Sequence, residues 1–390
     1  MKKCGLATIT VGANYGNKLQ NYALQQVVRS FGFQPETIRY QPIYPYNSIV
    51  AKILRKLKEW RSYNIIAVLF DMKRIIEKRL CKMLHPNVEK NRMDNFSEFV
   101  QTEIKMGSHE YCFNDDLSML NDQYDVFITG SDQVWNPYWE GVNPFYFLTF
   151  ADKRKRIAYA PSFGVEDIPK DLKDYYQSNL SPIPYLSTRE EQGQEIIQSL
   201  IHRKIPVLID PCFLLGHKAW LEIAKKAICR PAQEYLLCYF LGVKSHEHHK
   251  AIVRFAKKNN LTIVSLNDVT NPKGYVCGPA EFLDLIANAK AVCTDSFHGT
   301  VFSIIFNRPF ITFIRSCSNK RESMNSRIDT LLNSFGLQDC LFQSDLTWEN
   351  VLQINFNKTN CILEDKRKFA LSYLSDALNN INNDIIGENY

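Results

Sequence analysis

The sequence of 390 residues lacks the long apolar run that a membrane-spanning helix needs. Its longest candidate, Ile65–Phe70, has six residues, whereas a transmembrane helix takes about 20. No apolar segment of the signal-peptide type follows the lysines of Met1–Cys4. These absences predict a cytoplasmic protein, and they leave only a peripheral contact with the inner face of the membrane.

Cysteine patterns that indicate zinc or disulfides are also missing. The chain has 11 cysteines, an odd number, without a C-x-x-C pair. Cys238 and Cys293 stand inside apolar segments, as expected of reduced, buried thiols in a cytoplasmic protein. The His-rich stretch Ser245–His249 lacks the H-E-x-x-H spacing, so we interpret it as the start of a solvated helix. The sequence therefore predicts no metal site.

Positive charge is concentrated in one segment. Of the formal net charge of +6, residues 52–82 contribute +7, because they hold ten Lys/Arg against three Asp/Glu. The rest of the chain is nearly neutral, which argues against nucleic-acid binding. Apolar residues at helical spacing predict a helical insertion over about 45–95. It is either a solvated basic helix pair or a platform for an anionic partner, such as a membrane surface or a lipid pyrophosphate.

Short β-rich runs alternate with helical segments along most of the chain, from "CGLATIT" near the N-terminus to "PFITFI" near residue 310. This alternation predicts parallel sheets that are covered by helices. We therefore expect an α/β fold with two Rossmann-like domains, 1–182 and 183–350, facing a central cleft. A helical tail over 351–390 follows.

In such folds, ligands bind where strands end and helices begin. The stretch "CTDSFHGTVFSIIF" places polar residues at one such point. Ser296 is suited to cap the next helix, whose free N–H groups favour an anion. His298 supplies a proton or a positive charge, and Gly299 and Thr300 complete the turn. The alternative is a capped helix whose histidine bonds a neighbouring loop.

A second polar loop, "ITGSDQVWNP", also follows a strand. Trp135 beside Ser131, Gln133 and Asn136 suits a sugar. The apolar face of a sugar ring stacks on an aromatic side chain, while the sugar hydroxyls form hydrogen bonds with polar side chains. Asp132 is a candidate general base. The alternative is an Asx-type turn.

Two further loops are less specific. Arg189 in "LSTRE" offers a two-pronged donor to a phosphate or carboxylate, or else forms a surface pair with a glutamate. The loop "VGANYGN" lacks the spacing of a phosphate-binding loop, so Asn14 and Asn17 are candidate ligand amides only.

Taken in order and spacing, the motifs resemble the polysaccharide pyruvyl transferase family from the first strand to about residue 337. They are "ANYGNKLQNYALQ", "GSDQVWNP", "IAYAPSFG", "LSTREEQG", "LIDPCFLL", "GPAEFLDLIANAKAVCTDSFHGTVFSIIFNRPF" and "NSRIDTLLNSFGL". The resemblance implies a glycosyltransferase-B-like fold with phosphoenolpyruvate bound mainly by the second domain. The acceptor, bound by the first domain, is a sugar in a polysaccharide or lipid-linked glycan, and the product is a pyruvate ketal. No cofactor is implied besides phosphoenolpyruvate as co-substrate.

The resemblance also assigns roles. His298 matches the family's histidine and is the candidate acid or phosphate-neutralising group, with Asp132 as the candidate base. The candidate substrate contacts are Arg189, Ser296, Gly299, Thr300, Arg327, Asn14, Asn17, Ser131, Gln133, Trp135, Asn136 and Glu281.

One departure concerns the donor site. Some family members have Arg-Leu-His where this chain has Ser296-Phe297-His298, so Arg327 or Lys320 would have to replace the missing cation. Two other functions stay open at this point: a nucleotide-sugar-dependent glycosyltransferase of the same fold, and a catalytically silent glycan-binding protein.

Overall fold

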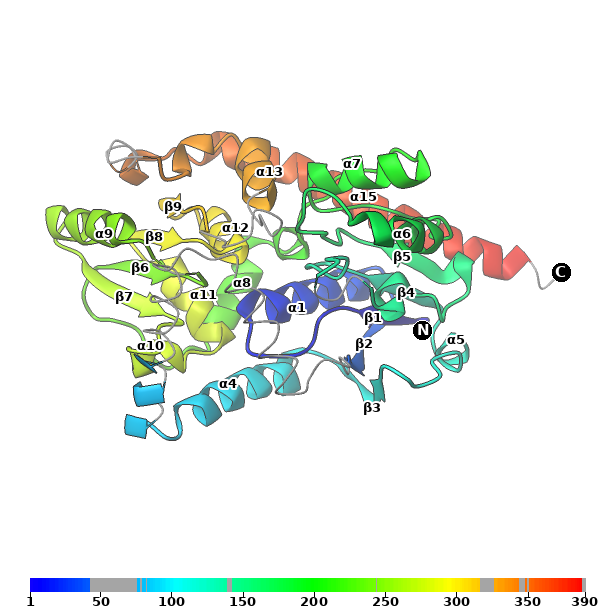
Figure 1. Cartoon of the computed structure of the whole chain (residues 1–390), viewed down its shortest axis with the longest axis horizontal. Helices are drawn as coiled ribbons and strands as arrows, with labels where there is room; N and C mark the ends of the chain where they lie inside the picture. The colour runs from blue at the N-terminus through cyan, green and yellow to red at the C-terminus, as the bar shows by residue number, and fades with distance from the viewer. Residues whose placement is uncertain are drawn as a thin grey trace.

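Two parallel β-sheets with packed helices build the protein (Figure 1), which confirms the predicted fold class. The computed structural model describes residues 1–42, 76–77, 79–81, 83–138, 142–242, 244–315, 326–343, 348 and 351–387. The basic segment 52–82 and the insertion expected over 45–95 fall mostly outside these ranges. Their described end leads into helix α4 (Val88–Glu103).

The first sheet has the strand order β3-β2-β1-β4-β5, and all neighbouring strands are parallel. Its central strand buries the last four of its five residues, as a strand covered on both faces must. The five strands are β1 (Lys3–Ala7), β2 (Gln34–Gln41), β3 (Met106–Cys112), β4 (Val126–Thr129) and β5 (Arg156–Ala158).

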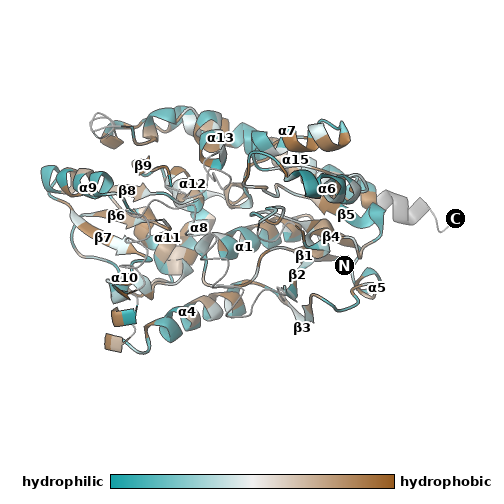
Figure 2. Ribbon diagram, in the orientation of Figure 1, coloured by the Kyte–Doolittle hydropathy of each residue, from teal (hydrophilic) through white to brown (hydrophobic). Residues whose placement is uncertain are grey.

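The second sheet has the order β7-β6-β8-β9 and is also parallel. Figure 2 shows apolar residues concentrated on its strands, whereas the helix α9 beside them is largely hydrophilic. Cys238 and Cys293 are buried partners on neighbouring strands, as the sequence predicted. The strands are β6 (Tyr235–Tyr239), β7 (Thr262–Leu266), β8 (Ala291–Thr294) and β9 (Phe310–Thr312).

Helices connect and cover these strands. In the described part of the chain, no helix is long and apolar enough to cross a membrane. Ser245 caps α9 by accepting a hydrogen bond from the backbone N–H of His248, so the His-rich stretch is a helix start. Besides α4, the helices are α1 (Tyr15–Ser30), α5 (Leu120–Gln123), α6 (Lys173–Leu180), α7 (Glu191–Ile201), α8 (His217–Ala224), α9 (His246–Lys258), α10 (Pro272–Tyr275), α11 (Pro279–Asn288), α12 (Phe297–Ile305), α13 (Ser326–Phe335) and α15 (Asn357–Gly387).

The segment 183–208 belongs with the first sheet. Tyr185 forms a parallel bridge with Ile157, at the edge strand β5. Helix α7 buries Ile196 and Ile197 in the same core as β4 and β5. The boundary expected near residue 182 therefore falls too early.

The last helix also returns to the first sheet. Ala370 and Leu374 of α15 pack into the core around Cys4 and Leu6 of β1, and the hydroxyl group of Tyr373 donates to the carbonyl oxygen of Ala158 in β5. The expected C-terminal tail is thus an integral part of the N-terminal unit.

Helices α1 and α4 join the two units. Tyr15, at the start of α1, stacks on Phe282 of α11 with 4.5 Å between ring centroids. From α4, Arg92 donates to the carbonyl oxygens of Tyr275 in the second unit and of Ala13 in the loop before α1. Its guanidinium group lies 4.8 Å from the ring centroid of Tyr275. Arg92 therefore fixes the start of α1 against the second unit.

Replacing Arg92 by leucine should destabilise the protein, because the carbonyl groups of Ala13 and Tyr275 lose a donor inside it. An unpaired buried acceptor costs about 1–3 kcal/mol, so the free energy of unfolding in urea should fall by roughly 2–5 kcal/mol. Lys90→Ala on the same helix is the control, since it removes only an exposed ion pair with Asp94. Equal unfolding midpoints for the two variants would contradict this role of Arg92.

Candidate active site

The predicted loops of both units meet at one buried carboxylate, that of Asp210. Arg189 donates from Nη1 to Asp210 Oδ2 at 2.7 Å, and Ser131 Oγ donates to the same oxygen at 3.1 Å. From the second unit, Nε2 of His298 lies 3.4 Å from it. Three segments that are distant in the sequence therefore converge at the junction of the units.

Asp210 is held in its ionised form. Burial by itself raises the pKa of this carboxyl group. The charges of His298 and Arg189, together with a hydrogen bond from the backbone N–H of Cys212, outweigh burial and hold the pKa well below its usual range. Sequence reasoning missed Asp210. The available signal was its position between an apolar run and Pro211 in the motif "LIDPCFLL".

His298 packs against the start of α1. A Cβ atom at position 16 would lie 2.0 Å from its Nδ1 atom, so only glycine leaves room for the imidazole. The loop "VGANYGN" therefore contributes to the site by leaving space for the imidazole of His298. Asn14 caps α1 by accepting a hydrogen bond from the backbone N–H of Asn17 at 3.2 Å, which gives the predicted ligand amide of Asn14 a structural role.

Two buried guanidinium groups lie over one aromatic ring. That of Arg189 is 4.3 Å from the ring centroid of Phe297, and that of Arg327, from the first turn of α13, is 5.8 Å away. Nε and Nη2 of Arg189 and Nε of Arg327 have no hydrogen-bond partner among the described residues. Buried donors of this kind need an acceptor.

The electrostatics of the two arginines differ. Burial lowers the pKa of Arg189, but the carboxylates of Asp210, Asp132 and Glu190 reverse the effect and raise it overall. The pKa of Arg327 falls to about 10 because of burial and, next, because of the positive charge of Arg189. Arg327 thus adds positive charge that the described residues do not neutralise by an ion pair, and an anionic ligand would relieve this.

The helix start that follows β8 has internal partners. Ser296 Oγ accepts from the backbone N–H of Gly299 at 3.3 Å, so the predicted cap is confirmed. A Cβ atom at Gly299 would lie 2.5 Å from Thr294 Oγ1, which is a packing reason for glycine. Thr300 Oγ1 lies 2.9 Å from the hydroxyl oxygen of Thr312. Gly299 and Thr300 therefore support the turn from within.

The loop at 130–136 divides into a site part and a core part. Asp132 Oδ1 lies 4.0 Å from Arg189 Nη2, which brings the candidate base to the site. Trp135 has no exposed surface, stacks on Phe147 and donates from Nε1 to the carbonyl oxygen of Tyr146. The expected sugar-stacking role of Trp135 is therefore wrong, because the ring lies in the core.

Three other predicted contacts are placed as follows. Asn136 Oδ1 accepts from the backbone N–H of Tyr138, which is an Asx-type turn. Gln133 is buried, and its Nε2 has no hydrogen-bond partner among the described residues. Glu281 accepts from the backbone N–H of Gly278 and so caps α11. Lys320 lies outside the described residues.

One group of described residues has metal-ligand chemistry. The ligand atoms of Asp210, Cys212 and His298 lie within 4.8 Å of one another. However, burial and the charge of Asp210 raise the pKa of the Cys212 thiol, and Arg189 already neutralises Asp210. This set therefore fits a metal ion poorly.

The protein therefore has a two-unit parallel α/β fold, with a buried arginine–histidine–carboxylate cluster at the junction of the units. The sequence matches the family model of the polysaccharide pyruvyl transferases over residues 14–316. The chain belongs to this family, and it is accordingly a transferase.

Solved structures with a similar chain trace share little sequence. UDP-GlcNAc 2-epimerase from Neisseria meningitidis bound to UDP-GlcNAc is 10% identical, with a TM-score of 0.46 over 96% of this chain and 99% of that one. UDP-GlcNAc 2-epimerase from Methanocaldococcus jannaschii is 13% identical, with a TM-score of 0.46 over 92% and 93%. A UDP-glucosyltransferase from Polygonum tinctorium is 11% identical, with a TM-score of 0.39 over 97% of each chain. No curated protein matches the sequence significantly.

The ionised carboxylate of Asp210 should make stability depend on pH. Its pKa is lowered by folding, so its stabilisation is complete above the unfolded value, about 3.9, and is lost as pH falls below it. Asp210→Asn should lower the free energy of unfolding at about pH 7, and the deficit should shrink towards about pH 3. Urea unfolding across this range measures it. Asp167→Asn, at an exposed pair with Lys173, is the control, and a deficit independent of pH would contradict the assignment.

Proposed function

We propose that the protein transfers pyruvate from phosphoenolpyruvate to two hydroxyl groups of a sugar, within a polysaccharide or a lipid-linked glycan, with release of phosphate. The observation that carries this proposal is the pair of buried guanidinium groups on Phe297, from Arg189 and Arg327, with unmatched N–H donors. Phosphoenolpyruvate carries a phosphate and a carboxylate, and both are acceptors that suit guanidinium donors.

The two arginines can replace the cation that is missing at Ser296, where some family members have an arginine. The arginine that some relatives have at this position is absent, but Arg189 and Arg327 bring two cations to the same ring from other segments. At the start of α12 the N–H groups of Gly299 and Thr300 bond to Ser296, so those of Phe297 and His298 are the ones that can meet an anion, which the helix dipole favours. We assign the donor's anionic groups to these cations and to this helix end.

The reaction balances with the groups at hand. One acceptor hydroxyl bonds to C2 of the donor while the methylene carbon takes a proton and becomes a methyl group. The second hydroxyl then displaces phosphate from the same carbon. Of the two protons lost by the hydroxyls, one balances the proton on the methyl group, and the other leaves with phosphate.

We assign the proton transfers to His298 and Asp132. Nε2 of His298 lies 3.4 Å from the carboxylate of Asp210, and we assign the delivery of a proton to the departing phosphate to this imidazole. Asp132, beside Arg189, is the base for the attacking hydroxyl.

Arg327→Met should weaken phosphoenolpyruvate binding in calorimetry by about 10- to 100-fold, because a charge-assisted hydrogen bond contributes about 1.5–3 kcal/mol. The variant should fold, since methionine fills a buried site without a charge. Arg29→Met, at the exposed end of α1, is the matched control. Unchanged affinity in Arg327→Met would remove this arginine from the donor site.

His298→Gln keeps a hydrogen-bonding group but cannot carry a charge or transfer a proton. Acid–base catalysis contributes about 10²–10⁴-fold, so phosphate release should slow at least about 10²-fold. Thermal unfolding should change little, because Ser296 still caps α12. His246→Gln, at the exposed start of α9, is the control. A variant that melts several degrees lower and keeps most of its turnover would make His298 a structural residue.

A further inference from the structure

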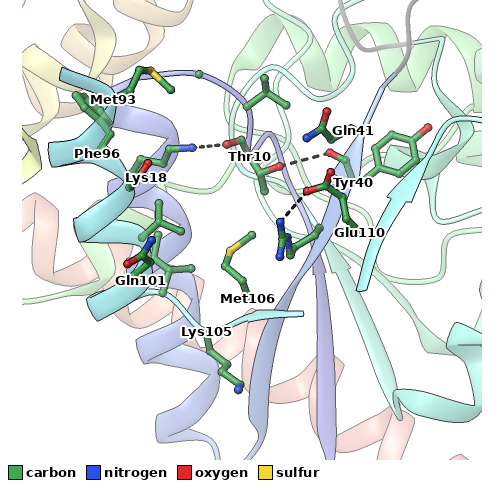
Figure 3. Close-up of a pocket in the computed structure, with 16 residues that line it drawn as sticks. Thr10, Lys18, Tyr40, Gln41, Met93, Phe96, Gln101, Lys105, Met106 and Glu110 are labelled. Carbon is green, nitrogen blue, oxygen red and sulfur yellow. Dashed lines mark hydrogen bonds and ion pairs between the residues drawn. The ribbon is translucent and has the colours of Figure 1, made fainter. Parts of the chain in front are cut away.

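A cavity of about 670 Å³ opens on the first unit, between α1 and α4 (Figure 3). Thr10–Gly12, which follow β1, and Gln41, which ends β2, are part of its lining. The lining also includes Lys105 and Met106 at the start of β3, so the cavity extends from the amino end of that edge strand to the carboxyl ends of β1 and β2, where ligands of open parallel sheets bind. Its volume is that of a small-molecule site, about 300–1,000 Å³.

The cavity has an apolar wall and a polar wall. Met93, Phe96 and Val100 recur every three or four residues on α4 and line one face of that helix, and Ile104 follows directly after its end. The wall from the sheet is mostly polar, and Figure 3 shows its residues Tyr40, Gln41 and Glu110 across the cavity from α4, with Lys18 of α1 beside α4. The polar lining residues are Thr10, Lys18, Arg39, Tyr40, Gln41, Lys105 and Glu110, together with Ser97 and Gln101 of α4. The ligand should therefore have an apolar face and several hydrogen-bonding groups.

The ammonium group of Lys18 is the position at which we expect a negatively charged group of the ligand. Its side chain is more than nine-tenths buried, and its ammonium group donates to the carbonyl oxygen of Thr10. No salt bridge to it exists among the described residues, whereas the neighbouring Arg39 is paired with Glu110 at 2.8 Å. Burial lowers the pKa of Lys18 to about 8, which records the cost of this unpaired charge. An anionic ligand would supply the missing partner.

The cavity and the His298 cluster share the first turn of α1. Gly16 contacts the imidazole of His298, and Lys18 follows two residues later. Two residues span about 3 Å along a helix and about 200° around it, so the two sites lie on opposite sides of this turn.

We propose that the cavity is an acceptor subsite for a carboxylate-bearing sugar unit, next to the unit that receives pyruvate, with Lys18 as counter-ion. This inference rests on the proposed function. The sugar ring lies on the apolar face of α4, and its hydroxyls meet Thr10, Gln41 and Gln101. An isoprenoid chain would leave those polar groups without partners, which favours the sugar.

The test is a binding titration of the full chain without phosphoenolpyruvate. The acidic probes are hyaluronan and polygalacturonate tetrasaccharides, the neutral probe is chitotetraose, and the lipid probe is farnesyl phosphate. An acidic tetrasaccharide should bind at least about tenfold more tightly than the neutral one. Lys18→Met should abolish that preference and remain folded, because it removes an unpaired buried charge. Lys257→Met, at the exposed last turn of α9, should change nothing.

A pH series adds an independent readout. The wild type should lose its preference for the acidic probe above about pH 8, as Lys18 loses its proton. Lys18→Arg should keep the preference there, because arginine stays charged. The other charged side chains that line the cavity, Arg39, Lys105 and Glu110, are the same in both proteins. The difference therefore reports on position 18.

Each remaining outcome decides the matter. Binding of the acidic probes that is absent, or unchanged in Lys18→Met, overturns the subsite. Binding of farnesyl phosphate alone, dependent on Lys18, overturns the sugar assignment and makes the cavity a lipid-phosphate site. If the acidic probes bind as expected but no phosphate is released from phosphoenolpyruvate with any glycan acceptor, the proposed function fails and the acceptor role fails with it, while the cavity stands as a binding site for an acidic sugar.

Discussion

One carboxylate oxygen, Oδ2 of Asp210, fixes the geometry of the junction between the two sheets. Arg189, Ser131 and His298 reach it from three separate segments. A buried carboxylate without partners costs free energy, so its partners are kept at hydrogen-bonding or ion-pairing distance from it. Arg189 is thereby held over Phe297, and His298 is held against Gly16. The cation cluster and the imidazole occupy their places because this one charge cannot be left unmatched.

The pattern of short apolar runs and helical spacing was enough to predict two parallel sheets, since each strand can be recognised from a few consecutive residues. Contacts between residues that are distant in the sequence were harder to predict. Asp210 was missed, because nothing in the sequence ties it to an arginine 21 positions earlier or to His298. Trp135 was assigned to sugar binding from its polar neighbours in the chain, yet its ring turns into the core beneath the sheet. The boundary failed because Tyr185 continues the first sheet by a single bridge, too short to show as a strand.

Helix α1 serves both sides of the proposed reaction. Its second residue, Gly16, makes room for His298, its first, Tyr15, packs on the second unit, and Lys18 faces the cavity of the first unit. Arg92 ties the loop before α1 to the second unit. If α1 shifted, Gly16 and Lys18 would move together. The His298 cluster and the cavity would then keep their positions relative to each other.

The return of α15 to the first sheet has a consequence for how such proteins diversify. Ala370 and Leu374, near the end of the chain, complete the core that begins with Cys4. A gene recombination with one breakpoint between the two sheets would join an N-terminal unit to a foreign final helix and leave that core mismatched. Exchange of a whole second unit needs two breakpoints, one on each side of it. These proteins should therefore diversify more readily by substitution within loops than by the exchange of whole units.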